Sequence, residues 1–99
     1  MGNKVVITGM GTVNPVGLNV EETWKSLLEG RSGIARIRAF DTDEWNLQTK
    51  IAGEVKGFDP ESWMNRKEAR RLDRFSQFAL AAAKEAIAQS GLPMEGDTR

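Results

Sequence analysis

The most concentrated chemistry in this sequence is a run of positive charge between residues 66 and 74. Five cations and two anions in this stretch leave a local charge of +3, although the whole chain of 99 residues has a formal net charge of zero. The cations are Arg66, Lys67, Arg70, Arg71 and Arg74. Their spacing sets like charges one helical turn apart, which disfavours a helix by a few tenths of a kcal/mol per pair. The run therefore indicates either a solvated face with ion pairs to other segments or a docking surface for an acidic partner.

The residue types that are missing from the chain exclude several kinds of catalytic chemistry. The chain contains no cysteine and no histidine, so it has no thiol nucleophile, no imidazole acid or base and no disulfide. A zinc site would have to be built from carboxylates alone. We therefore expect no catalytic residue, no metal site and no bound cofactor in this chain.

Two glycines follow an apolar run near the N-terminus. Val5–Ile7 is β-branched throughout, which predicts a strand buried between two layers. Gly9 and Gly11 then resemble the start of a dinucleotide-binding loop, but Asn14 replaces the third glycine, Pro15 interrupts the helix that should follow, and no acidic residue ends a second strand. The glycines instead predict a tight turn or close packing against this backbone.

The next elements follow from capping and periodicity. Asn19 with Glu22 three residues later forms a capping-box pattern, and Gly30 ends the helix that it begins. One face of this helix is apolar, carrying Val20, Trp24, Leu27 and Leu28. Residues 31–47 mix polar, glycine and isolated apolar residues, and we expect them to form a structured loop.

A second strand is predicted within Gln48–Phe58, where apolar and glycine residues alternate with polar ones. Residues 59–64 begin with Asp-Pro, which is typical of a cap followed by a first-turn proline, and predict a short helical turn. Trp45 and Trp63 are expected to pack in the core or at its rim. The order of elements is then β-α-loop-β-α, an α/β arrangement.

The positive run opens a helix predicted from Arg66 to Gln89. Asn65 with Glu68 forms a second capping-box pattern. At 100° per residue, the five cations share an arc of about 140°, next to an apolar face. That face contains Leu72, Phe75, Ala79, Ala82, Ala83 and Ala86, and its alanines allow another segment to pack closely. Alternatively, Asp73 caps a second helix, in which case the arc holds only for the first piece.

Several short motifs, in this order, give the chain a family resemblance. They are Val5-Val-x-Thr-Gly-x-Gly11, Pro15-Val-Gly17, Glu22-Thr-Trp-Lys25 with Leu27 and Gly30, Ser32-Gly-Ile34, Phe40-Asp-Thr42, Ala52-Gly-x-Val-Lys56, the run Arg66–Phe75, the alanine-rich stretch Ala79–Ala88, and Ser90-Gly-Leu92. Together they resemble the N-terminal quarter of the β-ketoacyl-acyl carrier protein synthases, especially the elongating type II enzymes. The catalytic cysteine and two histidines of that family lie beyond this quarter.

The resemblance implies a fold and an activity. The family has a thiolase-like layered αβαβα fold, of which residues 1–99 would form the N-terminal portion of the first half and no complete independent domain. It implies a usually homodimeric acyltransferase that carries out decarboxylative Claisen condensation in fatty acid elongation. Related alternatives are a fragment of a polyketide ketosynthase or of a chain-length factor. An alternative of a different class is a stand-alone module that binds an acidic partner.

The resemblance also assigns a partner to the positive run. Family members receive substrates on acyl carrier protein, and basic residues in a K-x-x-R-K/R pattern contact it. This pattern places the contact on Lys67, Arg70 and Arg71, with Arg66 and Arg74 as possible additional docking residues. Nucleic acid is the other candidate polyanion, but no aromatic residues are interleaved with the cations. We expect no membrane partner and a cytoplasmic protein, because the apolar runs are short and no signal peptide precedes the first strand.

Overall fold

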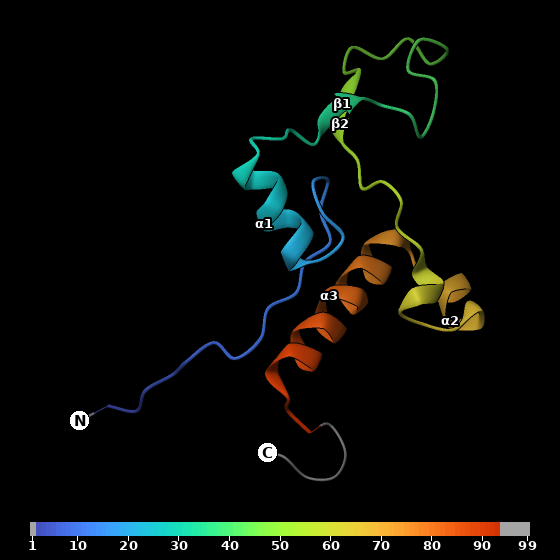
Figure 1. The fold of residues 1–99 in the computed structure, drawn as a ribbon. Helices are drawn as coiled ribbons and strands as arrows, with labels where there is room; N and C mark the ends of the chain where they lie inside the picture. The colour runs from blue at the N-terminus through green and yellow to red at the C-terminus, as the bar shows by residue number, and fades with distance from the viewer. Residues whose placement is uncertain (1, 94–99) are drawn as a thin grey trace. The chain divides into compact units, whose positions relative to one another are not determined.

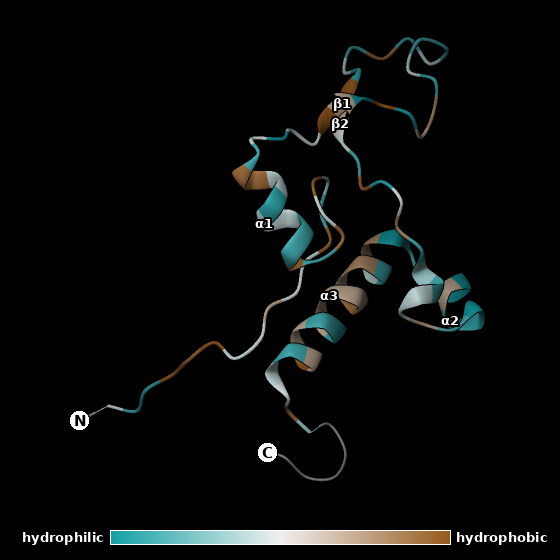
Figure 2. Ribbon diagram, viewed as in Figure 1, coloured by the Kyte–Doolittle hydropathy of each residue, from teal (hydrophilic) through white to brown (hydrophobic). Residues whose placement is uncertain are grey.

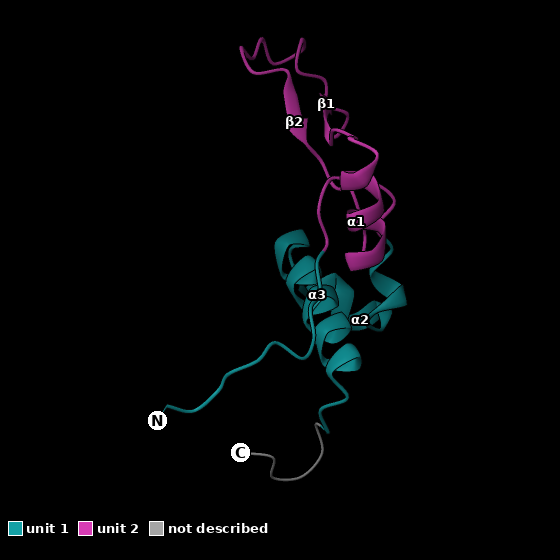
Figure 3. Cartoon of the chain, turned by 60° about the vertical axis from the view of Figure 1, so that its left-hand side comes forward, with its two compact units in different colours: residues 1–12, 59–99 teal, residues 13–58 magenta. Residues whose placement is uncertain are grey.

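A computed structural model describes residues 2–93 of the chain. Its elements are, in order, α1 (Val20–Leu28), β1 (Ile34–Arg36), β2 (Ile51–Gly53), the 3-10 turn η1 (Pro60–Ser62), α2 (Arg66–Arg71) and α3 (Arg74–Ser90) (Figure 1). They belong to two compact units, which Figure 3 colours separately. One unit comprises residues 1–12 and 59–99, and the other comprises residues 13–58. The chain is thus a mixture of helix and strand, as predicted.

In the first unit, α3 is the element against which other segments pack. Residues 9–12 run along it, with the Met10 N–H donating to Gln89 Oε1 at 2.7 Å and the Thr12 N–H donating to Glu85 Oε1 at 3.1 Å. A Cβ atom added at Gly9 would lie 2.0 Å from the carbonyl oxygen of Ala86. Added at Gly11, it would lie 1.8 Å from that of Ala82. The expected close approach at these glycines, and the close packing that the alanines allow, are both confirmed.

The single helix predicted from Arg66 to Gln89 is wrong, and the alternative of two helices is correct. Leu72 adopts an extended conformation, with φ −105° and ψ 138°, so α2 ends before it. Asp73 is the N-cap residue of α3, although its side chain makes no capping hydrogen bond. The Asn65 cap of α2 is confirmed, as is the short turn η1, which Asp59 caps. Four of the five cations therefore belong to α2, and Arg74 begins α3.

The segment Val5–Ile7 does not form the predicted strand within the described residues. Its side chains are 94%, 72% and 82% exposed, and no strand lies beside it to take its backbone hydrogen bonds. An isolated extended segment has no hydrogen-bonded neighbour and no layer to cover it, so its apolar character alone cannot make it a strand.

In the second unit, α1 follows the prediction closely. Asn19 Oδ1 accepts a hydrogen bond from the Glu22 N–H at 2.8 Å, and Glu22 Oε1 accepts one from the Leu18 N–H at 3.0 Å. Gly30, with φ 71°, follows the helix in the left-handed conformation that terminates it at little cost. The apolar face of α1 is uncovered, however, because Trp24, Leu27 and Leu28 are each more than half exposed.

The second unit also holds a hairpin that the sequence only half predicts. β1 pairs antiparallel with β2, with Ala35 opposite Ala52. The predicted strand within Gln48–Phe58 is thus only three residues long, and β1 lies inside what was expected to be loop. Three residues are too few to show a period of two, which explains why β1 has no recognisable pattern.

Little apolar surface is buried in the described residues. The buried hydrophobic residues are Met64, Ala69 and Ala81, all in the first unit. Trp45 is 68% exposed, so its expected packing is wrong, whereas Trp63 is half-buried. Figure 2 colours the apolar segment near the N-terminus, the end of α1 and part of β1 brown, and the large apolar residues of these segments are more than half exposed. No helix in the described range 2–93 is long and apolar enough to cross a membrane.

We predict that the 99-residue chain does not fold cooperatively by itself. Two short strands rarely make an independent sheet, and the few buried side chains cannot offset the conformational entropy of ordering the chain. Circular dichroism should show partial helix and a gradual thermal loss of signal. A sharp two-state melt together with a dispersed amide NMR spectrum from soluble monomer would contradict this. Measurements that need a folded protein therefore require the complete product of the reading frame that carries this chain.

Candidate functional site

The positive run forms an exposed basic surface in the first unit. We define this surface as Arg66, Lys67, Arg70 and Arg71 of α2 with Arg74 at the start of α3; all five side chains are exposed. The structure thus brings the predicted residues together on one short helix and at the start of the next. Because α2 and α3 are separate helices, the common arc of the prediction applies to the four residues of α2 only.

Contacts from both ends hold α2 in place. At its start, Asn65 Oδ1 accepts a hydrogen bond from the Glu68 N–H at 2.8 Å. At its end, the Gln77 Nε2 group donates to the carbonyl oxygens of Ala69 at 2.9 Å and of Leu72 at 3.4 Å. On its inner side Ala69 is buried. The helix therefore turns its charged side chains outward and its one small apolar residue inward.

The turn before α2 is fixed to α3 as well. The Lys84 ammonium donates to the carbonyl oxygen of Trp63, and Met64 is 6% exposed. Such contacts matter because a helix of six residues is far below the length at which helices are stable alone, about 12–15 residues. The basic surface therefore depends on tertiary contacts with α3.

The five cations differ in how they are neutralised. Arg66 Nε lies 3.5 Å from Glu61 Oε1 in an exposed ion pair, which contributes about 0–1 kcal/mol at most. The Arg74 guanidinium lies over the Phe78 ring, 4.9 Å from its centroid. Within residues 2–93, Lys67, Arg70 and Arg71 form no ion pair. Their charge is therefore available to an acidic partner, although the docking itself stays a prediction.

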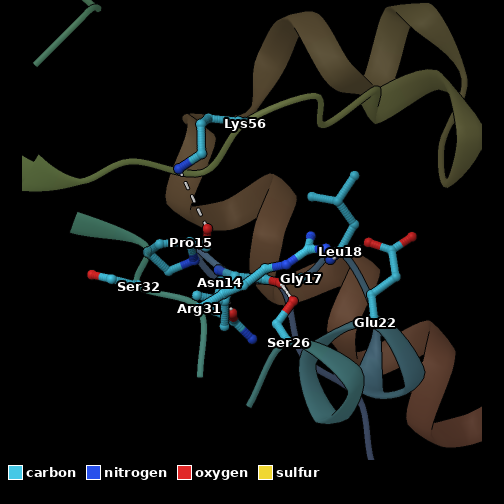
Figure 4. Close-up of a pocket in the computed structure, with 10 residues that line it drawn as sticks. Asn14, Pro15, Gly17, Leu18, Glu22, Ser26, Arg31, Ser32 and Lys56 are labelled. Atoms are coloured by element: carbon cyan, nitrogen blue, oxygen red, sulfur yellow. Dashed lines mark hydrogen bonds between the residues drawn. The ribbon is translucent and has the colours of Figure 1, made fainter. Parts of the chain in front are cut away.

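A hollow in the second unit was not predicted. It has a volume of about 270 Å³ and is shown in Figure 4. The residues that line it are Asn14, Pro15, Val16, Gly17, Leu18, Glu22, Ser26, Arg31, Ser32 and Lys56. The only signal in the sequence is Asn14-Pro-Val-Gly17, which is typical of a turn and not of a site.

The turn at Asn14–Gly17 organises this hollow. Asn14 and Gly17 exchange backbone hydrogen bonds of 2.9 and 3.2 Å, and Asn14 Oδ1 accepts one from the Val16 N–H at 2.9 Å. A Cβ atom at Gly17 would lie 2.5 Å from the backbone nitrogen of Thr23. Only glycine allows the turn to approach α1 so closely.

Two polar side chains around the hollow, those of Ser26 and Lys56, donate to this turn. Ser26 Oγ donates to the carbonyl oxygen of Val16 at 2.7 Å, and Lys56 Nζ donates to that of Pro15 at 3.4 Å (Figure 4). Lys56 Nζ also donates to the carbonyl oxygen of Glu54 at 2.9 Å. These groups satisfy backbone carbonyls and are not paired as nucleophile and base. These hydrogen bonds hold the turn in place, and they do not indicate a catalytic step.

Two carboxylates of the second unit have lowered pKa values. The pKa of Glu54 lies below its ordinary value of 4.5, because its carboxylate accepts hydrogen bonds from the backbone N–H groups of Arg38 and Ala39. The pKa of Asp43 is lowered by Lys50, which donates to it at 2.7 Å, and by Arg36 at 2.8 Å. Both carboxylates tie the segment between β1 and β2 to the strands.

The lowered pKa of Glu54 predicts a pH dependence of this segment. A lowered folded pKa stabilises the fold above the unfolded value near 4.5, and this stabilisation is lost as pH falls through the folded value. In an NMR titration from pH 6 to 3, the amide protons of Arg38 and Ala39 should shift together with a midpoint below 4.5. The two shifts should vanish in Glu54→Gln and persist in the control Glu44→Gln. A midpoint at or above the ordinary value would refute the two hydrogen bonds.

Nearly the whole chain is similar to proteins of one known family. A family model described as beta-ketoacyl synthase, N-terminal domain, matches residues 2–98. A protein of Vibrio cholerae named 3-oxoacyl-[acyl-carrier-protein] synthase 2 is 52% identical over 89 residues, which cover 90% of this chain and 21% of that protein. The protein of the same name from Staphylococcus aureus (strain N315) is 43% identical over 95 residues, covering 96% of this chain and 22% of its own length.

A solved structure, the ishigamide ketosynthase/chain length factor, is 36% identical in sequence and superposes with a TM-score of 0.76. The match covers 89% of this chain and 21% of the chain in that structure. These matches confirm the resemblance predicted from the motifs. The chain spans about a fifth of the length of the curated relatives it matches.

Proposed function

The chain belongs to the beta-ketoacyl synthase N-terminal domain family, and from this membership we propose that it is part of a 3-oxoacyl-acyl carrier protein synthase of fatty acid elongation. The names of the curated relatives support this choice of pathway. The solved ketosynthase/chain length factor supports a polyketide ketosynthase or a chain-length factor as the second candidate. We also propose the thiolase-like layered fold, a homodimer and a cytoplasmic location for the complete protein.

The proposed reaction is a decarboxylative Claisen condensation. A cysteine thiolate attacks the acyl-carrier thioester, takes the acyl group and releases the carrier thiol. Malonyl-carrier then loses carbon dioxide, and two histidines stabilise the enolate oxygen. The resulting carbanion attacks the acyl-enzyme and releases the cysteine thiolate. Since this chain contains neither cysteine nor histidine, its own share is scaffold and docking surface.

The docking proposal is carried by one observation, the three exposed cations on α2 that form no ion pair among the described residues. An acidic recognition helix on the carrier would supply the opposite charge to Lys67, Arg70 and Arg71. Arg66 and Arg74 would add to the field around them. Charges at the rim of an interface act mainly on the rate of association and its salt dependence.

A stand-alone module that binds another acidic partner is the rival from a different class. Translation of the reading frame beyond Arg99 separates the two. A continuing frame with one cysteine in a small-residue turn and two later histidines supports the synthase. A stop codon at that point favours the module or a truncated product.

We predict that the purified 99-residue chain has no condensing or malonyl-decarboxylating activity. It lacks the nucleophile and the imidazoles on which both half-reactions depend. The assay would follow carbon dioxide release and carrier-bound product with acyl-carrier and malonyl-carrier substrates. Turnover above the protein-free background would contradict the proposed mechanism.

In the complete protein, we predict that Arg70→Glu combined with Arg71→Glu raises KM for carrier-bound substrate about tenfold, equivalent to about 1.4 kcal/mol. Lys67→Glu should act in the same direction. Small acyl thioesters without a carrier should react nearly as in the native protein, because the change affects only docking. Lys25→Glu is the matched control, since it reverses an exposed cation of α1 in the second unit. Equal losses with both substrate types would mean that the basic surface is structural.

A further inference from the structure

The carbonyl groups at the end of α2 need hydrogen-bond donors, and the adjacent chain supplies the Leu72 N–H, which donates to Ala69 at 3.3 Å. The last four carbonyl groups of any helix lack an intrahelical partner, and in a helix of six residues they are most of its carbonyls. Like charges at Arg66 and Arg70, and at Lys67 and Arg71, disfavour the helix further. The two arginines at its end carry the charge that docking requires, so the order of this last turn decides how they are presented.

The side chain of Gln77 lies across this end. It comes from the first turn of α3, is 9% exposed, and donates its amide to the carbonyl oxygens of Ala69 and Leu72 at 2.9 and 3.4 Å. The first bond is itself buried. The Ala69 carbonyl oxygen also accepts the Leu72 N–H at 3.3 Å, and the Gln77 amide adds a shorter, buried bond to the same oxygen. One residue on α3 therefore helps to fix the direction in which α2 ends.

Resting on the proposed docking function, we propose that Gln77 is a positioning residue for the basic surface. Its amide keeps the last turn of α2 ordered, so that Arg70 and Arg71 face an acidic partner as one preformed pair. Without that amide, the turn is ordered for only part of the time. The apparent affinity then falls by the fraction of molecules in which it is ordered.

Two variants of Gln77 test this in the complete protein, with acyl carrier protein as the probe. Gln77→Glu keeps the shape and removes the donor, whereas Gln77→Met removes the donor without adding charge. Each should weaken carrier binding about fivefold, corresponding to an ordered fraction of about one fifth. Amide hydrogen exchange should accelerate at Arg70 and Arg71 and stay unchanged in the second half of α3.

The matched control is Gln89→Met. It makes the same chemical change on the same helix, but Gln89 accepts from the Met10 N–H and does not contact α2. Carrier binding should remain at the native level in this variant. An equal loss of binding in Gln89→Met and Gln77→Met would overturn the assignment, because the loss would then report general damage to α3.

A double-mutant cycle with Arg70→Ala and Arg71→Ala distinguishes this proposal from the docking proposal. If Gln77 acts through the two arginines, Gln77→Met should weaken binding no further once they are gone. An undiminished fivefold effect in that background would overturn the positioning role. Unchanged binding in Gln77→Met and Gln77→Glu, with a loss in the arginine variant, would overturn it while leaving docking intact. Unchanged binding in the arginine variant would overturn both.

If the variants of the buried Gln77 do not fold, Asn65→Ala tests whether carrier binding depends on the order of α2. Asn65 is exposed and caps the opposite end of α2, so its loss loosens the same helix without disturbing the interior. Faster exchange at Arg70 and Arg71 in this variant should again be accompanied by weaker carrier binding. Faster exchange with native affinity would show that order in α2 does not matter for docking, and would overturn the proposal.

Discussion

The close approach of backbone to backbone is the constraint on which each unit of this chain depends. In the first unit, Gly9 and Gly11 lie so near the carbonyl oxygens of Ala86 and Ala82 that no side chain fits between them. In the second unit, Gly17 has the same relation to Thr23. Contacts of this kind need no large buried side chains, and few apolar residues are buried among the described residues. These contacts make the structure sensitive to substitution, because a methyl group added at any of these glycines would displace a helix or a turn.

The basic surface follows from this construction. Residues 9–12 pack along the second half of α3, and the first turn of the same helix places Gln77 at the end of α2. A six-residue helix with like charges one turn apart would not persist alone. Its order comes from the helix it packs on, and its charge remains unneutralised at Lys67, Arg70 and Arg71 within the part of the chain described.

The sequence predicts what is encoded locally and misses what depends on distant segments. The caps at Asn19 and Asn65 and the close approach at the glycines follow from residue types at fixed spacing. The strand at Val5–Ile7 fails because a strand requires a neighbour, and none lies beside it among the described residues. The break at Leu72 was foreseen only as an alternative, because the continuous helical pattern from Arg66 to Gln89 does not show it; in the structure Asp73 is the N-cap of a second helix. Four of the five cations share α2, as the two-helix alternative implies, whereas Arg74 belongs to α3. The hollow around Pro15 was not predicted, because a turn of common residue types forms its lining.

The docking role of the basic surface is the central claim, and its most direct test is the ionic-strength dependence of the association rate. Rim charges that steer an acidic carrier accelerate encounter at low salt, and this advantage is screened within about 10 Å at 0.1 M salt. Stopped-flow mixing of the complete protein with acyl carrier protein should give an association rate that falls steeply with salt. In a variant with Lys67, Arg70 and Arg71 replaced by alanine, the dependence should be much flatter. An association rate with the same salt dependence in both proteins would contradict the account.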